Sequence, residues 1–297
     1  MNRTFIKKFG GYAYIFPWVL SFVILMLIPL ICLIIYSFTN YDLVSTPKWI
    51  GFENYIKMFT IDDEFWISLW VTTKYAVISV PLKLIISLAI AMLLNRPHKG
   101  LSIYRTLFYI PSIIGGSVAV AVMWKNLFAR DGGFNDVLGV IFGVKPDISW
   151  VADPRTALGS IILLVLWQFG STMIIFLAGL KNISDEYYEA AIMDGANKIQ
   201  QFFRITLPML SPVILFNLVM QIIGGFMVFT QGLIITNGGP DDKTLFYQLL
   251  VYNEGFVKLH MGYASALSVV LLIIISVLTA IVMRTSKHWV FYASEGR

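Results

Sequence analysis

Charged side chains are scarce in this sequence of 297 residues. Asp, Glu, Lys and Arg together make up 13% of it, where about 25% is usual for a soluble domain. Hydrophobic residues make up 58%, against a usual share of about 45–50%. This composition excludes an ordinary soluble domain and indicates an integral membrane protein. The net charge of +5 includes no basic run interleaved with aromatic residues, so nucleic acid is not predicted as a partner.

Signals for catalysis and for metal binding are missing as well. The sequence contains no G-x-x-x-x-G-K-[ST] stretch that could cradle the phosphates of ATP, and no H-E-x-x-H pair of zinc ligands. Its three histidines, His98, His260 and His288, stand apart from one another, and the single cysteine, Cys32, has no partner for an internal disulfide. We therefore predict that the chain is not an enzyme and binds no cofactor or metal itself.

Long apolar stretches are what the sequence has in abundance. A transmembrane helix needs about 20 predominantly apolar residues. Six stretches meet that length: 14–38, 68–94, 104–128, 157–180, 209–235 and 263–283. The second contains Pro81 and the fifth Pro212, which neighbouring helices in a membrane tolerate. The predicted fold class is an all-α membrane protein with six transmembrane helices.

The placement of charge predicts the orientation of these spans. With both termini in the cytoplasm, twelve of the 22 Lys and Arg residues fall in cytoplasmic segments or at the cytoplasmic end of a span, eight in outer loops or at the outer end of a span, and two inside the second span. The positive-inside rule therefore favours cytoplasmic N- and C-termini. Every Asp and Glu lies outside the six spans, which argues against a secondary carrier coupled to protons or sodium. That carrier is the remote alternative.

The segment 181–208 is polar and lies between two apolar stretches. Ser184 is suited to cap a helix that carries acidic residues in its first turn. Gly195 permits the positive φ that ends a helix sharply. A second short helix can begin near Asn197 and should end before Pro208. We expect two short helices at an angle, in a cytoplasmic loop shaped to dock onto another protein.

Three short motifs within this segment are similar to a loop of a known family of membrane proteins. Glu189-Ala190-Ala191, Asp194-Gly195-Ala196 and Ile205-Thr206-Leu207-Pro208 resemble the "EAA" loop of ABC-type import permeases. The resemblance implies that the loop sits in a cleft of a cytoplasmic ATPase and transmits its motion. The alternative is an ordinary amphipathic connector. The coupling residues that the resemblance implies are Glu189, Ala190, Ala191, Asp194, Gly195, Ala196, Leu207 and Pro208.

Three further stretches are similar to the carbohydrate branch of these permeases, specifically to its "first" permease subunit. They are Trp49-Ile50-Gly51-Phe52-Glu53-Asn54-Tyr55, Asn237-Gly238-Gly239-Pro240 and Met261-Gly262-Tyr263-Ala264-Ser265-Ala266. The resemblance implies a type I importer fold, with residues 1–297 forming one transmembrane domain in a bacterial cytoplasmic membrane. It also implies as partners a second homologous permease, two ATPase subunits carrying ATP and Mg, and an extracytoplasmic solute-binding protein. The implied solute is a sugar or oligosaccharide, with a phosphorylated polyol or other modified carbohydrate as the alternative.

A sugar pathway needs hydrogen-bonding side chains, flat aromatic faces and small residues held away from lipid. For glycine and serine, close helix packing is an equally good explanation. For Gln168 and Gln221 we favour a cavity-lining role, because a buried amide needs polar partners. The contact positions that the resemblance implies are Ser112, Gly116, Trp167, Gln168, Ser171, Gln221 and Gly225. At most of these positions the residue type differs from that of the maltose-type permease. The resemblance therefore supports the location of a sugar pathway better than it supports any single contact residue.

Lys83 stands near the middle of the second predicted span. A charge at the centre of a span costs roughly 2.5–3.5 kcal/mol on insertion scales. The lysine could contact the solute or the partner permease. It could instead snorkel, or bond a backbone carbonyl freed by Pro81. The sequence leaves both interpretations open.

Overall fold

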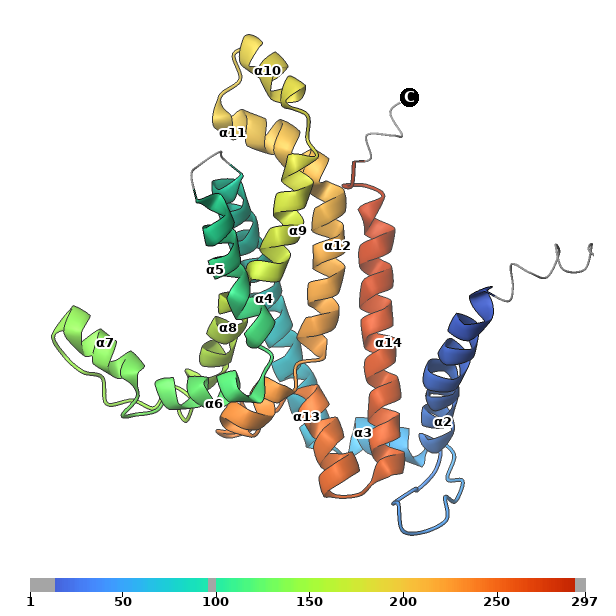
Figure 1. Ribbon diagram of the computed structural model, residues 1–297. Coiled ribbons are helices and arrows are strands. Elements are labelled where there is room, and N and C mark those ends of the chain that lie inside the picture. The colour runs from blue at the N-terminus through green and yellow to red at the C-terminus, as the bar shows by residue number, and fades with distance from the viewer. Residues whose placement is uncertain (1–13, 96–99, 292–297) are drawn as a thin grey trace, which may run out of the picture. The chain divides into compact units, whose positions relative to one another are not determined.

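The computed structural model describes residues 14–95 and 100–291, and over these ranges the chain is built from helices (Figure 1). Their one pairing of extended backbone is an isolated antiparallel bridge between Thr39 and Trp49. The chain divides into two compact units, one of Met1–Asp62 with Val251–Ile273 and one of Asp63–Leu250 with Ile274–Arg297. The predicted all-α class is confirmed. The two termini, which were predicted to be cytoplasmic, lie outside the described ranges.

The first unit contains the helical segment Tyr14–Tyr36, whose last part is α2 (Ile28–Tyr36). Helix α3 (Glu53–Thr60), the π-turn η4 (Asn253–Val257) and the start of α14 (Met261–Ser286) complete it. Tyr14–Tyr36 and α14 are each long and apolar enough to cross a membrane. They match the first and sixth predicted spans.

A turn after α2 joins these elements within the first unit. The buried Asn54 side chain donates hydrogen bonds to the carbonyl oxygens of Ser37 (2.8 Å) and Thr39 (2.9 Å). The backbone N–H of Gly262 donates to the carbonyl of Tyr41 (2.8 Å). A Cβ atom on Gly262 would lie only 2.0 Å from the Thr39 carbonyl oxygen, so a residue without a side chain is required. Two of the stretches that carried the family resemblance therefore meet at one turn.

Glu254 forms a polar cluster just before α14. Its carboxylate accepts hydrogen bonds from Lys258 Nζ (2.6 Å) and His260 Nδ1 (2.9 Å). Burial alone would raise the pKa of the Glu254 carboxyl, but these hydrogen bonds outweigh burial and hold the pKa below its usual value. His260, which looks isolated in the sequence, thus has an acidic partner six residues away.

The second unit is organised around α4 (Asp63–Leu94), which packs against α8, α9 and α12. Pro81 lies inside α4 without ending it. Helix α5 packs along α9, and Figure 1 shows these helices running side by side. The other α-helices that begin in this unit, in order, are α5 (Leu101–Ile114), α6 (Val118–Leu127), α7 (Gly133–Phe142), α8 (Ala157–Trp167), α9 (Gly170–Lys181), α10 (Asp185–Met193), α11 (Lys198–Gln201), α12 (Leu207–Phe226) and α13 (Tyr247–Tyr252).

The core of this unit joins α4, α9 and α12 at one end of the bundle. Small residues let the helices approach closely. A Cβ atom on Gly170 would lie 2.2 Å from the Phe108 carbonyl oxygen of α5, and one on Gly179 would lie 2.8 Å from the side chains of Leu210 and Val213 on α12. The buried core residues are Ala91, Leu94, Met173, Phe176, Leu177, Leu180, Ile183 and Leu210.

Two of the predicted spans are bent pairs of helices. The third consists of α5 and α6, which meet at 98°, and the fourth of α8 and α9, which meet at 43°. A straight helix over 104–128 is therefore wrong. Gly115 and Gly116 interrupt the helix, and Ser117 caps α6 by accepting a hydrogen bond from the Val120 N–H (3.4 Å). Counting each bent pair as one span gives six candidate spans in the described residues.

The predicted stop before Pro208 is also wrong. Lys198–Phe226 forms one continuous helical segment, in which the π-turn η2 (Phe202–Thr206) leads directly into α12. Leu207 N–H bonds to the Phe202 carbonyl in the wider turn, and Pro208 falls in the first turn of α12, where a missing N–H is tolerated. The helix then ends at Phe226, so the predicted span 209–235 is interrupted after that residue.

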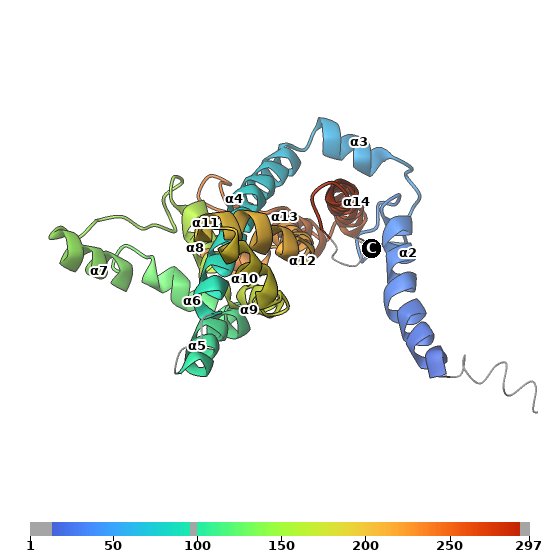
Figure 2. The ribbon, with the colours of Figure 1, turned by 90° about the horizontal axis from the view of Figure 1, so that it is seen from above.

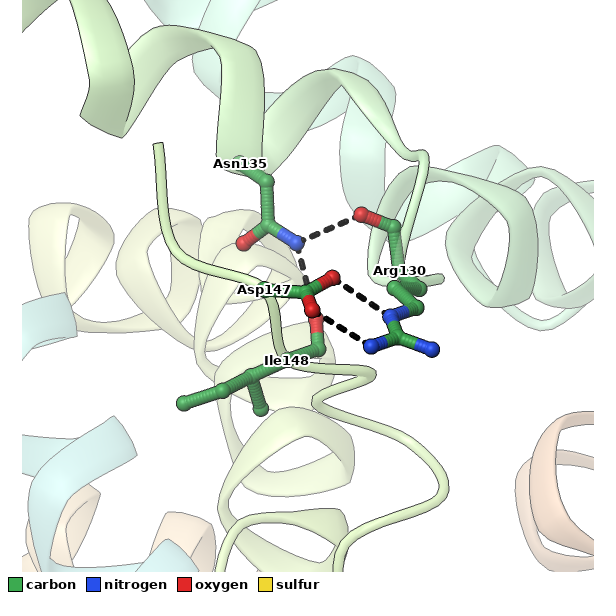
Figure 3. Close-up of polar contacts among 4 residues, drawn as sticks. All are labelled: Arg130, Asn135, Asp147 and Ile148. Carbon is green, nitrogen blue, oxygen red and sulfur yellow. Dashed lines mark hydrogen bonds and ion pairs between the residues drawn. The ribbon is translucent and has the colours of Figure 1, made fainter. Parts of the chain in front are cut away.

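A hairpin around α7 lies between α6 and α8 in the chain (Figure 1), and Figure 3 shows the polar contacts that join its two ends. The buried Asn135 side chain donates to the carbonyl oxygens of Arg130 and Ile148, both at 2.8 Å, and so joins the two ends of the hairpin. Arg130 and Asp147 form a two-pronged ion pair beside it. This pairing lowers the pKa of the Asp147 carboxyl. Helix α7 is the short helix at the centre of this hairpin.

Candidate functional site

A polar cavity of about 270 Å³ lies within the second unit, between α4, α8 and α12. Two interruptions of helical backbone adjoin it. One is the break between α8 and α9 at Gln168 and Phe169, and the other follows the end of α12 at Met227. Irregular backbone at membrane depth is tolerated where it lines a cavity or is buried in protein. The lining residues are Tyr75, Ser79, Val80, Lys83, Val165, Gln168, Gln221, Gly224, Gly225, Met227, Val228 and Gln231.

One face of α4 supplies the phenol, hydroxyl and ammonium groups of the lining. Tyr75, Ser79 and Lys83 follow one another at intervals of four residues, so their side chains lie one above another on the helix. Lys83 stands out in the sequence as a charge within a span, whereas Tyr75 and Ser79 were not predicted as lining residues. Their four-residue spacing from Lys83 is the signal that could have found them.

Two glutamines supply the amide groups. Gln168 Nε2 donates to the Gly115 carbonyl oxygen (2.9 Å), and Gln221 Nε2 donates to Thr172 Oγ1 (3.0 Å). No other hydrogen bond of either side chain is found within the described part of the chain. Each glutamine therefore keeps a second amide hydrogen and a carbonyl oxygen. Such a pair of donors and acceptors suits a hydroxyl-rich solute.

Two neighbouring glycines of α12 border the cavity in different ways. A Cβ atom on Gly224 would meet no atom within 4 Å, whereas one on Gly225 would lie 3.3 Å from the Cβ of Ala76 on α4. Gly224 thus faces open space, and Gly225 permits the close approach of α4 and α12.

Of the seven predicted contact positions, Gln168, Gln221 and Gly225 line this one cavity. The other four lie outside its lining. Ser112 Oγ donates to the Gln168 carbonyl (3.1 Å) and accepts from the Ser171 N–H (2.9 Å), so it satisfies backbone groups freed by the break between α8 and α9. Trp167 packs against Trp124, with ring centroids 5.9 Å apart. Gly116 is exposed at the bend between α5 and α6.

The loop formed by α10 and α11 is a second candidate site, at the end of the bundle where α9 and α12 meet (Figures 1 and 2). Ser184 Oγ accepts from the Glu186 N–H at the start of α10 (3.4 Å), which confirms the predicted cap. Gly195 has φ of +79°, as predicted. The adjacent hydrogen bond from the Ala196 N–H to the Ala191 carbonyl (2.8 Å) closes the helix end.

The second short helix of the loop also has a local cap. Asn197 Oδ1 accepts from the Gln200 N–H (2.9 Å), while Gln200 Oε1 accepts from the Asn197 N–H (2.8 Å). This reciprocal capping box starts α11 where the sequence predicted a helix. Tyr188 Oη and Thr206 Oγ1, 2.9 Å apart, share a hydrogen bond that connects α10 to η2.

The eight predicted coupling residues occupy two parts of this loop. Six lie in the α10 turn region, where Glu189, Ala190, Asp194 and Gly195 are exposed while Ala191 and Ala196 are half-buried. Leu207 and Pro208 are half-buried in the first turn of α12. A cavity of about 620 Å³, lined by the ends of α4 and α9 together with α10, α11 and η2, lies beneath the loop.

No group of three or more His, Cys, Asp or Glu side chains within residues 14–95 and 100–291 could hold a metal ion. Glu189 and Asp194, the acidic residues among the predicted coupling positions, are therefore not part of such a cluster. The cavity offers hydrogen-bonding groups and the ammonium of Lys83, and the loop offers surface contacts.

Comparison with known proteins identifies the family. Residues 83–290 match the model of the binding-protein-dependent transport system inner membrane component. The chain is 52% identical over 288 residues to the probable ABC transporter permease protein YesP of Bacillus subtilis (strain 168), covering 96% of this chain and 93% of that protein. It is 31% identical to the arabinooligosaccharides transport system permease protein AraP of the same organism, covering 94% of this chain and 89% of that protein.

A solved structure has the same fold. The crystal structure of a bacterial ABC transporter involved in the import of the acidic polysaccharide alginate contains a chain that matches with a TM-score of 0.83 at 22% identity, covering 96% of this chain and 97% of that chain. At this identity the likeness concerns the fold alone. From the family match, the chain belongs to the binding-protein-dependent transport system inner membrane components, and is a multi-pass membrane permease subunit of an ABC transporter and not an enzyme.

Proposed function

We propose that this chain is a permease subunit of an ATP-driven importer that carries a sugar or oligosaccharide into the cytoplasm. The observation that carries the proposal is the polar cavity beside two helix breaks. In it, Gln168 and Gln221 each keep an amide hydrogen and a carbonyl oxygen available beyond the one bond that each makes. Carbohydrate hydroxyls need such donors and acceptors. The relative named for arabinooligosaccharides supports the same solute class.

The cavity takes one end of the solute. Its volume of about 270 Å³ lies just below the roughly 300–1,000 Å³ of typical ligand sites. One sugar ring therefore contacts this chain, while a longer oligosaccharide extends toward the second, homologous permease. Gln168, Gln221 and Gly225 contact that ring. Ser112 acts indirectly, because its hydroxyl bonds to the Gln168 carbonyl and to the Ser171 N–H and so holds the backbone at the break between α8 and α9 in place.

The α10–α11 loop couples the permease to ATP hydrolysis on two partner ATPase subunits, which hold the ATP and Mg. Its exposed apolar side chains support this role, because Met193 is 87% exposed and Ile192 and Ile199 lie close to it in the chain. Apolar groups clustered on an otherwise polar loop mark a protein contact. The predicted coupling residues Glu189, Ala190, Ala191, Asp194, Gly195 and Ala196 belong to the same surface, and Leu207 and Pro208 join it to α12.

The chain acts as one transmembrane domain whose termini and α10–α11 loop, within residues 181–208, face the cytoplasm. An extracytoplasmic solute-binding protein delivers the solute. ATP-driven closure of the ATPases draws the loops of the two permeases together, so that the helices rock and the cavity opens outward. Hydrolysis then restores the inward-facing state.

The test uses the assembled complex in nanodiscs, containing this chain, the neighbouring permease and the ATPase. ATP hydrolysis is measured with the cognate binding protein, either empty or loaded with different sugars. We expect one loaded form to stimulate hydrolysis several-fold over the empty form. A well-assembled complex that no loaded sugar stimulates would overturn the carbohydrate assignment, and failure to co-purify with an ATPase would overturn the coupling role.

A further inference from the structure

Lys83 is the one charged residue in the lining of the cavity within the described part of the chain. It is 8% exposed, so its ammonium does not snorkel away from the unit. No hydrogen bond between this ammonium and the carbonyl freed by Pro81 is found among the described residues. The lysine is thus a buried polar group that borders the polar cavity.

A counter-ion for Lys83 is missing from the described residues. The lining contains no Asp or Glu, and none of the ion pairs found in residues 14–95 and 100–291 involves Lys83. A cation at the centre of a span costs roughly 2.5–3.5 kcal/mol on insertion scales. A buried charge is stabilised when an opposite charge with good hydrogen-bond geometry joins it.

We propose that the solute presents a carboxylate to Lys83, which makes it an acidic oligosaccharide with a uronate residue at the end held by this chain. The inference rests on the proposed function and narrows its solute class. Ser79 lies four residues before Lys83, which is about 6 Å along the helix axis, and lines the same cavity. Its hydroxyl is a donor for the second carboxylate oxygen.

The charge balance favours a carboxylate over a phosphate. A carboxylate carries one negative charge, which the single ammonium of Lys83 neutralises. A phosphate monoester carries about −1.5 to −2 at neutral pH, so it would leave negative charge uncompensated in a cavity with no Arg and no second Lys in its lining. The glutamine amides remain available for the ring hydroxyls.

The test measures uptake into proteoliposomes that contain the assembled importer, with its cognate binding protein supplied in excess. The probes are labelled disaccharides of galacturonate, glucuronate and mannuronate, their methyl esters, the corresponding neutral disaccharides, and glycerol 3-phosphate. Loading of the binding protein with each probe is checked separately. The variants are Lys83→Met, which removes the charge, and Lys83→Arg, which keeps it. Lys74→Met is the matched control, because Lys74 is an exposed lysine of the same helix outside the cavity lining.

We expect uptake of one of the uronate disaccharides, lowered about tenfold or more by Lys83→Met and within a few-fold of wild type for Lys83→Arg and Lys74→Met. Import of neutral disaccharides alone, or of a uronate with equal efficiency in Lys83→Met, would overturn the carboxylate assignment and leave the sugar importer standing. Import of glycerol 3-phosphate that depends on Lys83 would replace the carboxylate with a phosphate. A complex that imports no probe would overturn the proposed function as well.

Discussion

The α10–α11 loop and the cavity are held together by contacts of different range. In the loop, the caps at Ser184 and Asn197 and the turn at Gly195 use hydrogen bonds between residues two to five positions apart. In the cavity, Gln168 bonds to Gly115 and Gln221 to Thr172, across 53 and 49 positions. The loop is a local structure, and the cavity is a product of helix packing.

This difference bears on how the two sites work together. A loop stabilised by its own caps can keep its shape while the helices beneath it move. A cavity bounded by separate helices changes shape whenever those helices shift. The loop is therefore suited to transmit force and the cavity to respond to it. Substitutions that break one type of contact at a time distinguish these two roles.

The largest effect is expected from Gly195→Val. Gly195 has φ of +79°, and a β-branched residue in that region costs about 1–3 kcal/mol. The angle between α10 and α11 should change, so we expect transport to fall more than about tenfold while the protein still inserts into the membrane. Uptake and membrane content are measured together. Gly195→Asn is the matched control, because asparagine tolerates positive φ, and normal transport by the valine variant would contradict the geometric argument.

A smaller effect is expected from Gln221→Leu, which breaks a long-range contact of the cavity. The change removes the donor to Thr172 and leaves a buried hydroxyl without this partner, at a cost of about 1–3 kcal/mol. We expect uptake to fall roughly three- to tenfold at subsaturating solute. Met220→Leu, at an exposed position one residue earlier on α12, should transport normally. Equal uptake by both variants would remove Gln221 from the cavity site.

The local contacts are the ones that the sequence predicts best. A serine before acidic residues, a glycine after a helical run and Asn197 three residues before Gln200 are short patterns with a direct physical cause. The six spans follow from composition in the same way, because each apolar stretch must be long enough to cross the bilayer. The bends in these spans do not follow from composition, because a break at Gly115 or Gln168 depends on neighbouring helices that satisfy the freed backbone groups.

The cavity was predicted only in part for the same reason. Gln168 and Gln221 were assigned to it because a buried amide demands partners, and that argument needs no knowledge of packing. Ser112 is also a polar residue in a predicted span, yet its hydroxyl bonds to the Gln168 carbonyl and the Ser171 N–H and so satisfies backbone groups. The helical segment that begins at Lys198 was predicted to stop before Pro208, because proline commonly ends a helix. The wider turn at Phe202–Thr206 instead lets the helix continue into α12.

The two glycines of α12 should respond in opposite directions to alanine. Gly224→Ala adds a methyl group in open cavity space and removes the helix penalty of glycine, so we expect a gain of up to about 1 kcal/mol in stability with an approximately twofold loss of uptake. Gly225→Ala places its methyl group 3.3 Å from Ala76, and we expect a lower melting temperature. Thermal unfolding in nanodiscs distinguishes them. A loss of stability in both variants would mean that Gly224 is packed as closely as Gly225.

The smallest effect is expected from Tyr188→Phe, which tests the long-range hydrogen bond between Tyr188 and Thr206 in the loop. The bond between Tyr188 and Thr206 spans 18 positions and contributes about 0.5–1.5 kcal/mol. Because the caps of α10 and α11 are untouched, we expect less than about a twofold fall in solute-stimulated ATP hydrolysis. A double-mutant cycle with Thr206→Val measures the coupling between the two side chains. A coupling energy near zero would leave the loop held by its local caps alone, whereas a loss of stimulation as large as that of Gly195→Val would mean that this single contact joins the loop to α12.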